Sequence, residues 1–186
     1  MAHFQTLTRR DIGVVAGCAA AAIMLWLSFG LRSAGVLGAP IGDVPAVFYF
    51  WRGFLIRTLS EGALPWWNPH TFLGAPFIAS FQTAVFYPLT WLMLPMPTVW
   101  ALNASTVLHL WLGGLGAGLL ARARGATLVA AGFAAVTVAI SGPALARVAA
   151  GHTTMLAVVA WFPWFLWAVE AVLRSPSRRG LAGVAA

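Results

Sequence analysis

Acidic side chains are the scarcest reactive groups in this chain, which has four of them among 186 residues. One, Asp43, lies in the turn GAPIGDVP, after a long apolar run. A carboxylate there could take the proton from a hydroxyl nucleophile, and a general base contributes roughly 10²–10⁴-fold to a rate. The position equally suits a turn residue or the N-cap of a following helix. From its spacing alone, Asp43 is a candidate for either role.

The other three acids have positions that indicate structural roles. Asp11 stands beside an apolar run, and we expect it to be a solvated flank. Glu61 follows Arg57 by four residues, and Glu170 precedes Arg174 by four residues. This is the spacing of ion pairs on one helix face, so we expect pairing rather than catalysis at both glutamates.

Two histidines could also do chemistry. His152, in RVAAGHTTM, follows Arg147 by five residues, and the two side chains could either hold a phosphate or extend toward water at a membrane edge. His109 lies within an apolar run, where an ionisable group is a functional candidate, although a neutral histidine bonded to a neighbouring helix is the simpler explanation. The sequence has no phosphate-binding loop, no metal-spaced cluster of Cys and His, and no Ser/His/Asp arrangement.

The composition is that of an integral membrane protein. Charged residues make up 8% of the chain and hydrophobic residues 61%, whereas globular domains carry about 25% charged residues. From Gly62 to Ala121 there is no Asp, Glu, Lys or Arg. The net charge of +7 comes from scattered arginines, which favours membrane topology over nucleic-acid binding as its cause. The single Cys18 excludes a disulfide within the chain.

Four apolar runs have about the 20 residues that cross a bilayer core, and we predict that they are transmembrane helices. They cover residues 12–31, 99–120, 126–146 and 153–173. The final GLAGVAA is typical of the start of a fifth span, so we expect the chain to be part of a longer protein. The predicted fold is one all-α transmembrane domain over residues 1–186, with a long extracytoplasmic loop over residues 32–98.

Arginine positions predict the orientation of these spans. Seven of the eleven arginines lie at the N-terminus, between the second and third spans, or after the fourth span. Positive charge marks the cytoplasmic side of a membrane protein. We therefore expect a cytoplasmic N-terminus, with residues 32–98 and the turn at 147–154 outside.

The long loop has two parts. Residues 45–60 begin with a proline suited to a first helical turn and are predicted to form an interfacial amphipathic helix. Its apolar side would consist of Val47, Phe50, Trp51, Phe54 and Leu55. Six prolines follow between residues 62 and 98, and so many missing backbone donors exclude a lipid-exposed path at membrane depth. This segment must rest on protein or at the headgroup level.

Glycines and prolines predict local features of the spans. Gly114 and Gly118 form a small-xxx-small pair, which favours close helix packing. Pro143 and Pro163 lie inside the third and fourth spans and are expected to kink them.

The loop motifs resemble those of the YfhO family of bacterial membrane proteins, which belong to the GT-C superfamily of glycosyltransferases. Asp43 is followed by GALPWWNP at 62–69, GAPFIA at 74–79 and FYPL at 86–89. The likeness continues in LHLWLGGLGAGLLARARG and in SGPALARVAAGHTTMLAVVAWFPW. It covers most of residues 40–170, and implies a GT-C-like N-terminal part in a bacterial inner membrane.

The resemblance implies transfer of a sugar from a polyprenyl-phosphate-linked donor to a cell-envelope acceptor at the extracytoplasmic face. Asp43 would act as catalytic base or help hold a metal, with His152 near it as the other possible metal ligand. The leaving phosphate needs cationic stabilisation, from Arg147, Arg52 or a divalent cation such as Mg²⁺ or Mn²⁺. Expected partners are membrane lipid and the lipid-linked sugar, and no nucleic acid. The expected substrate-binding residues are Arg52, Trp66, Asn68, His70, Gln82, Tyr87, Arg147 and His152.

Two alternatives remain open at this stage. A non-catalytic polytopic protein, such as a lipid-binding or transport subunit, would use ionisable groups or broken helices near mid-membrane, for which His109 and Pro163 are candidates. An inactive fragment is the other alternative. The acidic-aromatic double motif of some protein mannosyltransferases is absent, because Val44 follows Asp43. The donor and the acceptor therefore stay open, and the absence argues against metal dependence.

Overall fold

The computed structural model describes residues 5–30 and 35–174, and it is mostly helical. Three stretches are long and apolar enough to cross a membrane: Thr98–Ala123, Leu128–Ala150 and Thr153–Leu173. They match three of the four predicted spans within a few residues. The first predicted span, 12–31, is helical as α1 (Arg9–Gly30), but residue 31 and the predicted fifth span at 180–186 lie outside the described residues. A fourth crossing stays a prediction.

The described residues fall into two compact units. The helical unit contains residues 5–30, 107–145 and 156–174, and the loop unit contains residues 35–106 and 146–155. Helices α4 (Thr98–Ala123), α6 (Gly142–Ala150) and α7 (Thr153–Arg174) contribute residues to both. Each unit is described by itself below.

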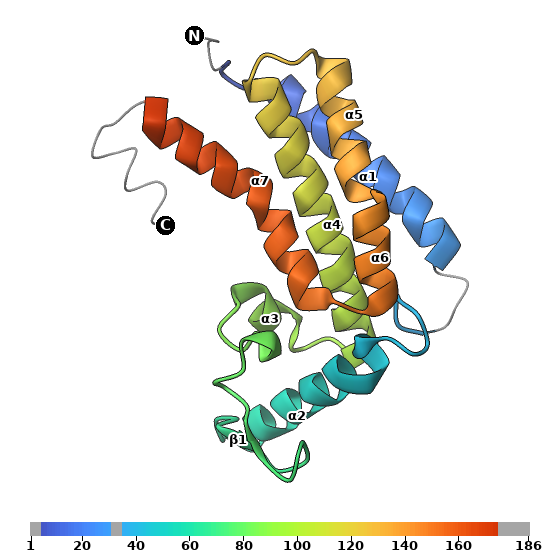
Figure 1. Cartoon of the computed structure of the whole chain (residues 1–186), viewed down its shortest axis with the longest axis vertical. Helices are drawn as coiled ribbons and strands as arrows, with labels where there is room; N and C mark the ends of the chain where they lie inside the picture. Colours follow the sequence, from blue (N-terminus) through green and yellow to red (C-terminus); the bar gives the residue numbers. More distant parts are fainter. Residues whose placement is uncertain (1–4, 31–34, 175–186) are drawn as a thin grey trace. The chain divides into compact units, whose positions relative to one another are not determined.

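In the helical unit, α1, α4 and α5 (Leu128–Ala139) run side by side (Figure 1). Their shared core consists of Val15, Ala19, Leu115, Leu119, Ala131 and Ala135. The predicted close packing at Gly114 and Gly118 is confirmed. A Cβ atom at Gly118 would lie 2.5 Å from Val15 Cγ1 and 2.8 Å from the carbonyl oxygen of Ala131. Only glycine allows the backbones to approach this closely.

The third predicted span is interrupted rather than simply kinked. Helix α5 ends at Ala139, and Ser141 caps α6 by accepting a 3.3 Å hydrogen bond from the Ala144 amide on its Oγ. Pro143 therefore sits in the first turn of α6, where its missing N–H breaks no helical bond. Helix α7 continues through Pro163.

Ion pairs in the helical unit differ from those predicted. Asp11 is not a solvated flank: it is 5% exposed and pairs with Nε of Arg122 at 2.8 Å. The Thr8 amide and hydroxyl donate to the same carboxylate, and Thr8 Oγ1 accepts from the Asp11 amide, which makes a capping box at the start of α1. Glu170 pairs with Arg124 at 2.8 Å. The side chain of its predicted partner, Arg174, lies outside the described residues.

The Asp11 pair predicts an acid-sensitive helical unit. The hydrogen bonds from Arg122 and Thr8 lower the pKa of Asp11 from 3.8 to about 2. A depressed pKa contributes stability that is fully present above the ordinary value and is lost as the pH falls from about 4 toward 2. We expect thermal unfolding of the detergent-solubilised protein to move to lower temperature across this range. Asp11→Asn should flatten that dependence, whereas Glu61→Gln, which neutralises an exposed acid, should leave it unchanged; an equally steep acid transition in Asp11→Asn contradicts the prediction.

In the loop unit, residues 44–60 are helical, as predicted, in two stretches. A π-helical turn, η1 (Val44–Phe48), leads into α2 (Tyr49–Ser60). The buried side of this helix differs from the prediction: Val44, Phe48 and Leu55 are buried, whereas Phe50 is 63% exposed. Whether the helix lies on a membrane surface stays a prediction.

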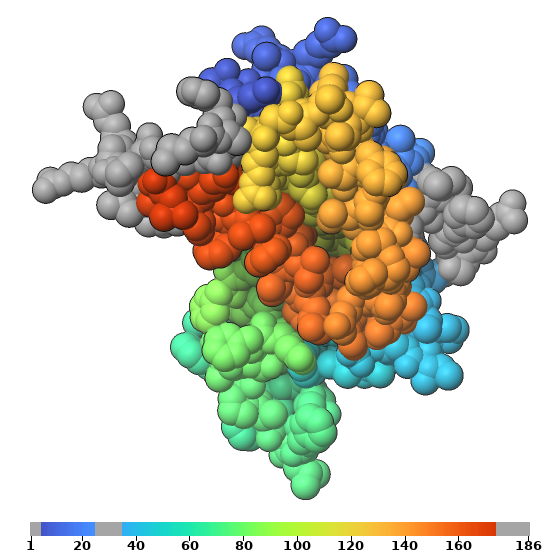
Figure 2. All heavy atoms as spheres, turned by 45° about the horizontal axis from the view of Figure 1, so that its top comes forward, coloured from blue at the N-terminus to red at the C-terminus, as the bar shows by residue number. Residues whose placement is uncertain are grey.

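The proline-rich segment that follows is packed protein rather than an open loop. It contains β1 (Trp67–Asn68), which pairs antiparallel with β2 (Ala75–Pro76), then η2 (Phe81–Thr83) and α3 (Pro88–Met93). Its Phe77 and Val85 share a core with Leu55 of α2, and the indole of Trp91 donates to the Val85 carbonyl at 2.7 Å. Figure 2 shows its atoms, in green, as a dense body. The segment rests on protein, one of the two surroundings predicted for it.

Candidate functional site

The candidate site begins at the C-terminal end of α6, in the loop unit. Gly151 has φ +80°, its amide donates to the Val148 carbonyl at 3.0 Å, and the His152 amide donates to the Arg147 carbonyl at 2.9 Å. These two hydrogen bonds define a Schellman motif, in which a left-handed glycine ends a helix. The motif brings the side chains of Arg147 and His152 together, although the two residues are five positions apart in the sequence.

Residues 38–44 pack directly on this helix end. The Ala39 amide donates to the Ala149 carbonyl at 2.9 Å. A Cβ atom at Gly151 would lie 2.6 Å from the Val44 nitrogen and 2.9 Å from the Asp43 nitrogen. One at Gly42 would lie 3.0 Å from the Ala150 carbonyl oxygen. Glycine at these positions therefore permits the backbone contact that sets Asp43 against His152.

Asp43 occupies the helix N-cap position, but its side chain does not cap. Its backbone is helical, at φ −62° and ψ −25°, instead of the extended conformation typical of N-cap residues, and no cap hydrogen bond forms. Instead, Oδ2 lies 3.4 Å from Nε2 of His152, with the Asp43 side chain 52% exposed. The sequence left two roles open for Asp43, a helix cap and a general base. Asp43 has the position of a cap but makes no cap hydrogen bond, so its carboxylate can still take a proton.

Arg147 determines which nitrogen of His152 carries the proton. One guanidinium nitrogen, Nη1, lies 3.0 Å from His152 Nδ1. Arginine can only donate hydrogen bonds, so Nδ1 must accept and the proton of the neutral ring lies on Nε2. Because Nε2 is the atom facing Asp43, the three side chains form a chain of contacts from Arg147 through His152 to the carboxylate.

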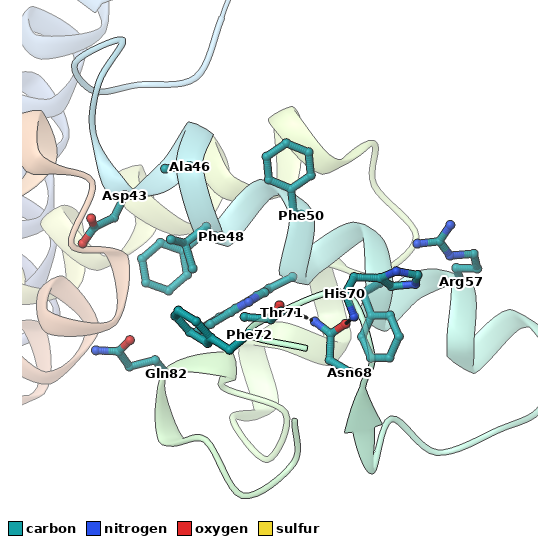
Figure 3. Close-up of a pocket in the computed structure, with 13 residues that line it drawn as sticks. Asp43, Ala46, Phe48, Phe50, Arg57, Asn68, His70, Thr71, Phe72 and Gln82 are labelled. Atoms are coloured by element: carbon teal, nitrogen blue, oxygen red, sulfur yellow. Dashed lines mark hydrogen bonds between the residues drawn. The ribbon is translucent and has the colours of Figure 1, made fainter. Parts of the chain in front are cut away.

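Asp43 also lines a pocket of about 780 Å³ whose walls come from the loop unit (Figure 3). Its wall from η1 and α2 carries Asp43, Val47, Phe50, Phe54 and Arg57, which recur every three or four residues. The opposite wall comes from the proline-rich segment. Most of the predicted apolar side of the helix therefore faces this pocket. The remaining lining residues are Ala46, Phe48, Trp51, Asn68, His70, Thr71, Phe72 and Gln82.

The pocket is aromatic along its length and polar toward its ends. In Figure 3, Asp43 and Gln82 lie toward one end and His70 and Arg57 toward the other, with Phe48 and Phe72 between them. The loop that carries His70 is held by Asn68, whose side-chain amide donates to Thr71 Oγ1 at 3.0 Å and accepts from the His70 amide at 2.9 Å. These bonds are local to the loop and orient the polar side chains of that end.

The structure brings together some predicted site residues and not others. Asp43, Asn68, His70 and Gln82 line the pocket, and Arg147 and His152 form the contacts with Asp43 described above. Three other predicted substrate-binding residues, Arg52, Trp66 and Tyr87, are absent from the pocket lining. Trp66 is 67% exposed, and Tyr87 immediately precedes α3.

Arg52 is partly buried, and its Nη1 has no hydrogen-bond partner among the described residues. Burial lowers the pKa of this guanidinium. His109, in the helical unit, is 2% exposed and has a partner, in keeping with the structural explanation of an intramembrane histidine.

Sequence reasoning missed Arg57, Thr71 and Phe72. Arg57 had a detectable signal, because it lies three residues after Phe54 and extends the helical stripe that begins at Asp43. Thr71 and Phe72 had none, since their positions depend on the backbone of the β1–β2 connection, where Phe72 has φ +51°.

Among residues 5–30 and 35–174, no group of three or more His, Cys, Asp or Glu side chains is arranged to hold a metal ion. Asp43 and His152 are two ligand types at one place, but the Nε2 that faces Asp43 carries the proton. Histidine binds metal through an unprotonated nitrogen. At this place, therefore, only the carboxylate of Asp43 can act as a metal ligand.

Comparison with known proteins assigns no family. No protein-family model matches the chain, and no curated protein or solved structure matches it. The likeness to YfhO proteins stays a prediction that rests on the sequence motifs of residues 40–170.

Proposed function

We propose that this chain belongs to a GT-C-like membrane glycosyltransferase, with Asp43 as the general base. The enzyme would act at the extracytoplasmic face of a bacterial inner membrane, with the N-terminus in the cytoplasm. The observation that carries the proposal is the carboxylate of Asp43, which is free of capping, paired with His152 and set in the wall of an aromatic pocket.

The proposed reaction needs one carboxylate. Asp43 takes the proton of an acceptor hydroxyl as its oxygen attacks the anomeric carbon of the donor sugar. The bond from that carbon to the phosphate oxygen breaks, and the polyprenyl phosphate leaves with the electron pair. No acid is required at the leaving group, because a phosphate leaves readily as an anion, unlike the alcohol that a glycosidase must protonate.

The pocket suits a sugar in size and lining. Its volume of about 780 Å³ lies within the range of about 300–1,000 Å³ that is usual for small-molecule sites. Phe48, Trp51 and Phe54 supply flat apolar walls for the C–H faces of a pyranose ring. Asn68 and Gln82 supply amides for its hydroxyl groups. These features support the proposal without distinguishing one hexose from another.

A divalent cation such as Mg²⁺ or Mn²⁺ fits this site only together with the donor. Mg²⁺ is commonly held through one or two carboxylates and substrate phosphates rather than by an all-protein cage. In that arrangement Asp43 would hold the cation instead of taking the proton of the acceptor hydroxyl, and the cation would neutralise the leaving phosphate. Arg57 is the pocket-lining cation that this chain itself provides for an anion.

Donor turnover tests the proposal. Membrane vesicles containing the complete protein would be supplied with polyprenyl-phosphate-linked tritiated glucose or, separately, mannose, together with envelope extract as acceptor. We expect loss of the labelled donor, appearance of label in the envelope fraction, and release of polyprenyl phosphate. Vesicles with an empty vector are the control. Saturable binding of donor without consumption would instead favour the lipid-binding or transport alternative.

A further inference from the structure

We infer that His152 and Arg147 are positioning residues, which hold the Asp43 carboxylate in one orientation, and not the substrate-binding residues that the sequence predicted. The inference rests on the proposed function and deepens it, because it names the residues that orient the catalytic carboxylate. Neither residue lines the pocket among the described residues.

The ring of His152 has no nitrogen left for a ligand. Nδ1 accepts from Arg147 at 3.0 Å, and Nε2 faces Asp43 Oδ2 at 3.4 Å. A residue with both ring nitrogens engaged by protein groups orients its neighbours, as outer-shell partners of reactive groups commonly do. The Schellman motif fixes the backbone beneath both residues, so the two side chains extend from fixed positions.

As a consequence, the two carboxylate oxygens of Asp43 have different roles. An unrestrained, half-exposed carboxylate rotates freely about its terminal torsion. The 3.4 Å contact between His152 Nε2 and Oδ2 keeps that oxygen toward the end of α6, and the other oxygen, Oδ1, would then take the proton of the acceptor hydroxyl. Figure 3 shows the carboxylate at this junction, between the turn after α6 and the pocket. Holding a base in its productive orientation raises kcat without strengthening substrate binding.

Arg147 acts on Asp43 only through His152 in this arrangement. Without the guanidinium, no donor opposes the tautomer with its proton on Nδ1, in which the lone pair of Nε2 faces the carboxylate. Removing Arg147 and removing His152 should therefore impair the same contact. Two residues that act through one contact are non-additive in a double-mutant cycle.

The first test is that cycle, measured as donor turnover by the complete protein in vesicles. His152→Leu and Arg147→Met are each expected to lower kcat by about 10–100-fold with KM changed by less than about twofold. The double variant should be no slower than His152→Leu. His152→Gln, whose amide N–H can reach the place of Nε2, should recover most of the lost kcat.

A pocket arginine provides the matched comparison. Arg57→Met removes the same guanidinium from a residue that lines the pocket, and we expect it to raise KM. If Arg147→Met also raises KM, or if its effect multiplies with that of His152→Leu, Arg147 binds substrate and the inference is wrong. Circular dichroism of each variant shows whether it is folded.

A second test needs no activity. In protein labelled with nitrogen-15 at histidine, the spectrum of His152, identified by its loss in His152→Gln, should show a protonated Nε2 and an unprotonated Nδ1. Arg147→Met should give a mixture of the two tautomers. A protonated Nδ1 in the wild type overturns the inference whether or not sugar is transferred. Absence of donor turnover with the expected spectrum overturns the proposed function and leaves the histidine geometry supported.

Discussion

Asp43→Asn is expected to lower the rate of sugar transfer by roughly 10²–10⁴-fold, the contribution of a general base. Asparagine keeps the size of the side chain and presents a carbonyl oxygen to Nε2 of His152, so the fold and the contact at 3.4 Å should survive. What is lost is the ability to take a proton. The measurement is initial donor consumption by vesicles containing equal amounts of the two proteins.

The outcome of this substitution separates catalysis from binding. If Asp43 is the base, saturable binding of the lipid-linked donor should remain close to that of the wild type while turnover collapses. Glu61→Gln, which neutralises an exposed acid at the end of α2, is the matched control and should transfer at the wild-type rate. Wild-type turnover by Asp43→Asn would falsify the assignment of the base, whatever the reaction is.

Gly118→Val is expected to destabilise the helical unit by at least about 1–3 kcal/mol, the usual cost of overpacking. A Cβ atom at this position meets Val15 Cγ1 at 2.5 Å and the Ala131 carbonyl oxygen at 2.8 Å. Because one of these neighbours is backbone, a rotamer change alone cannot relieve the clash, and α4 must move away from α1 and α5. Thermal and denaturant unfolding in mild detergent, followed by circular dichroism, measures the effect.

Gly17→Ala is the matched control for helix propensity. Gly17 lies on α1, and a Cβ atom there meets nothing within 4 Å. Alanine should therefore gain up to about 0.5–1 kcal/mol over glycine in a helix. If Gly118→Val lowers the stability while Gly17→Ala raises it, the loss at Gly118 is due to packing. An unchanged or raised stability in Gly118→Val would mean that the three helices do not pack through this glycine.

The helices of this fold could be predicted from the sequence because they depend on the length of apolar runs and on the spacing of residues within them. Three spans follow from apolar length, since a bilayer core requires about 20 apolar residues. The extent of η1 and α2 follows from helical spacing after Pro45. Pro143 was predicted to kink the third span. The span is instead divided into α5 and α6, and Ser141 caps the start of α6.

Pairings between distant residues were the least predictable part. Asp11 was expected in water and Glu170 beside Arg174, because helical spacing presents only partners within a turn or so. The structure pairs them with Arg122 and Arg124, over a hundred and over forty residues away in sequence. Which opposite charges lie within reach of each other across the helices is decided by the fold and not by their spacing along one helix.

For the candidate site, the sequence by itself determined which reactive groups are present: one carboxylate with no basic partner at helical spacing, a histidine and an arginine five residues apart, and an aromatic helix stripe. The family resemblance implied that His152 lies near Asp43, but the contact itself comes from the tertiary structure, because it requires Gly42 and Gly151 to let two distant backbone segments touch. It also turned most of the predicted apolar side of the helix toward a pocket. Helical spacing defines which residues share a face, but the neighbours of that face are set by packing of the whole chain.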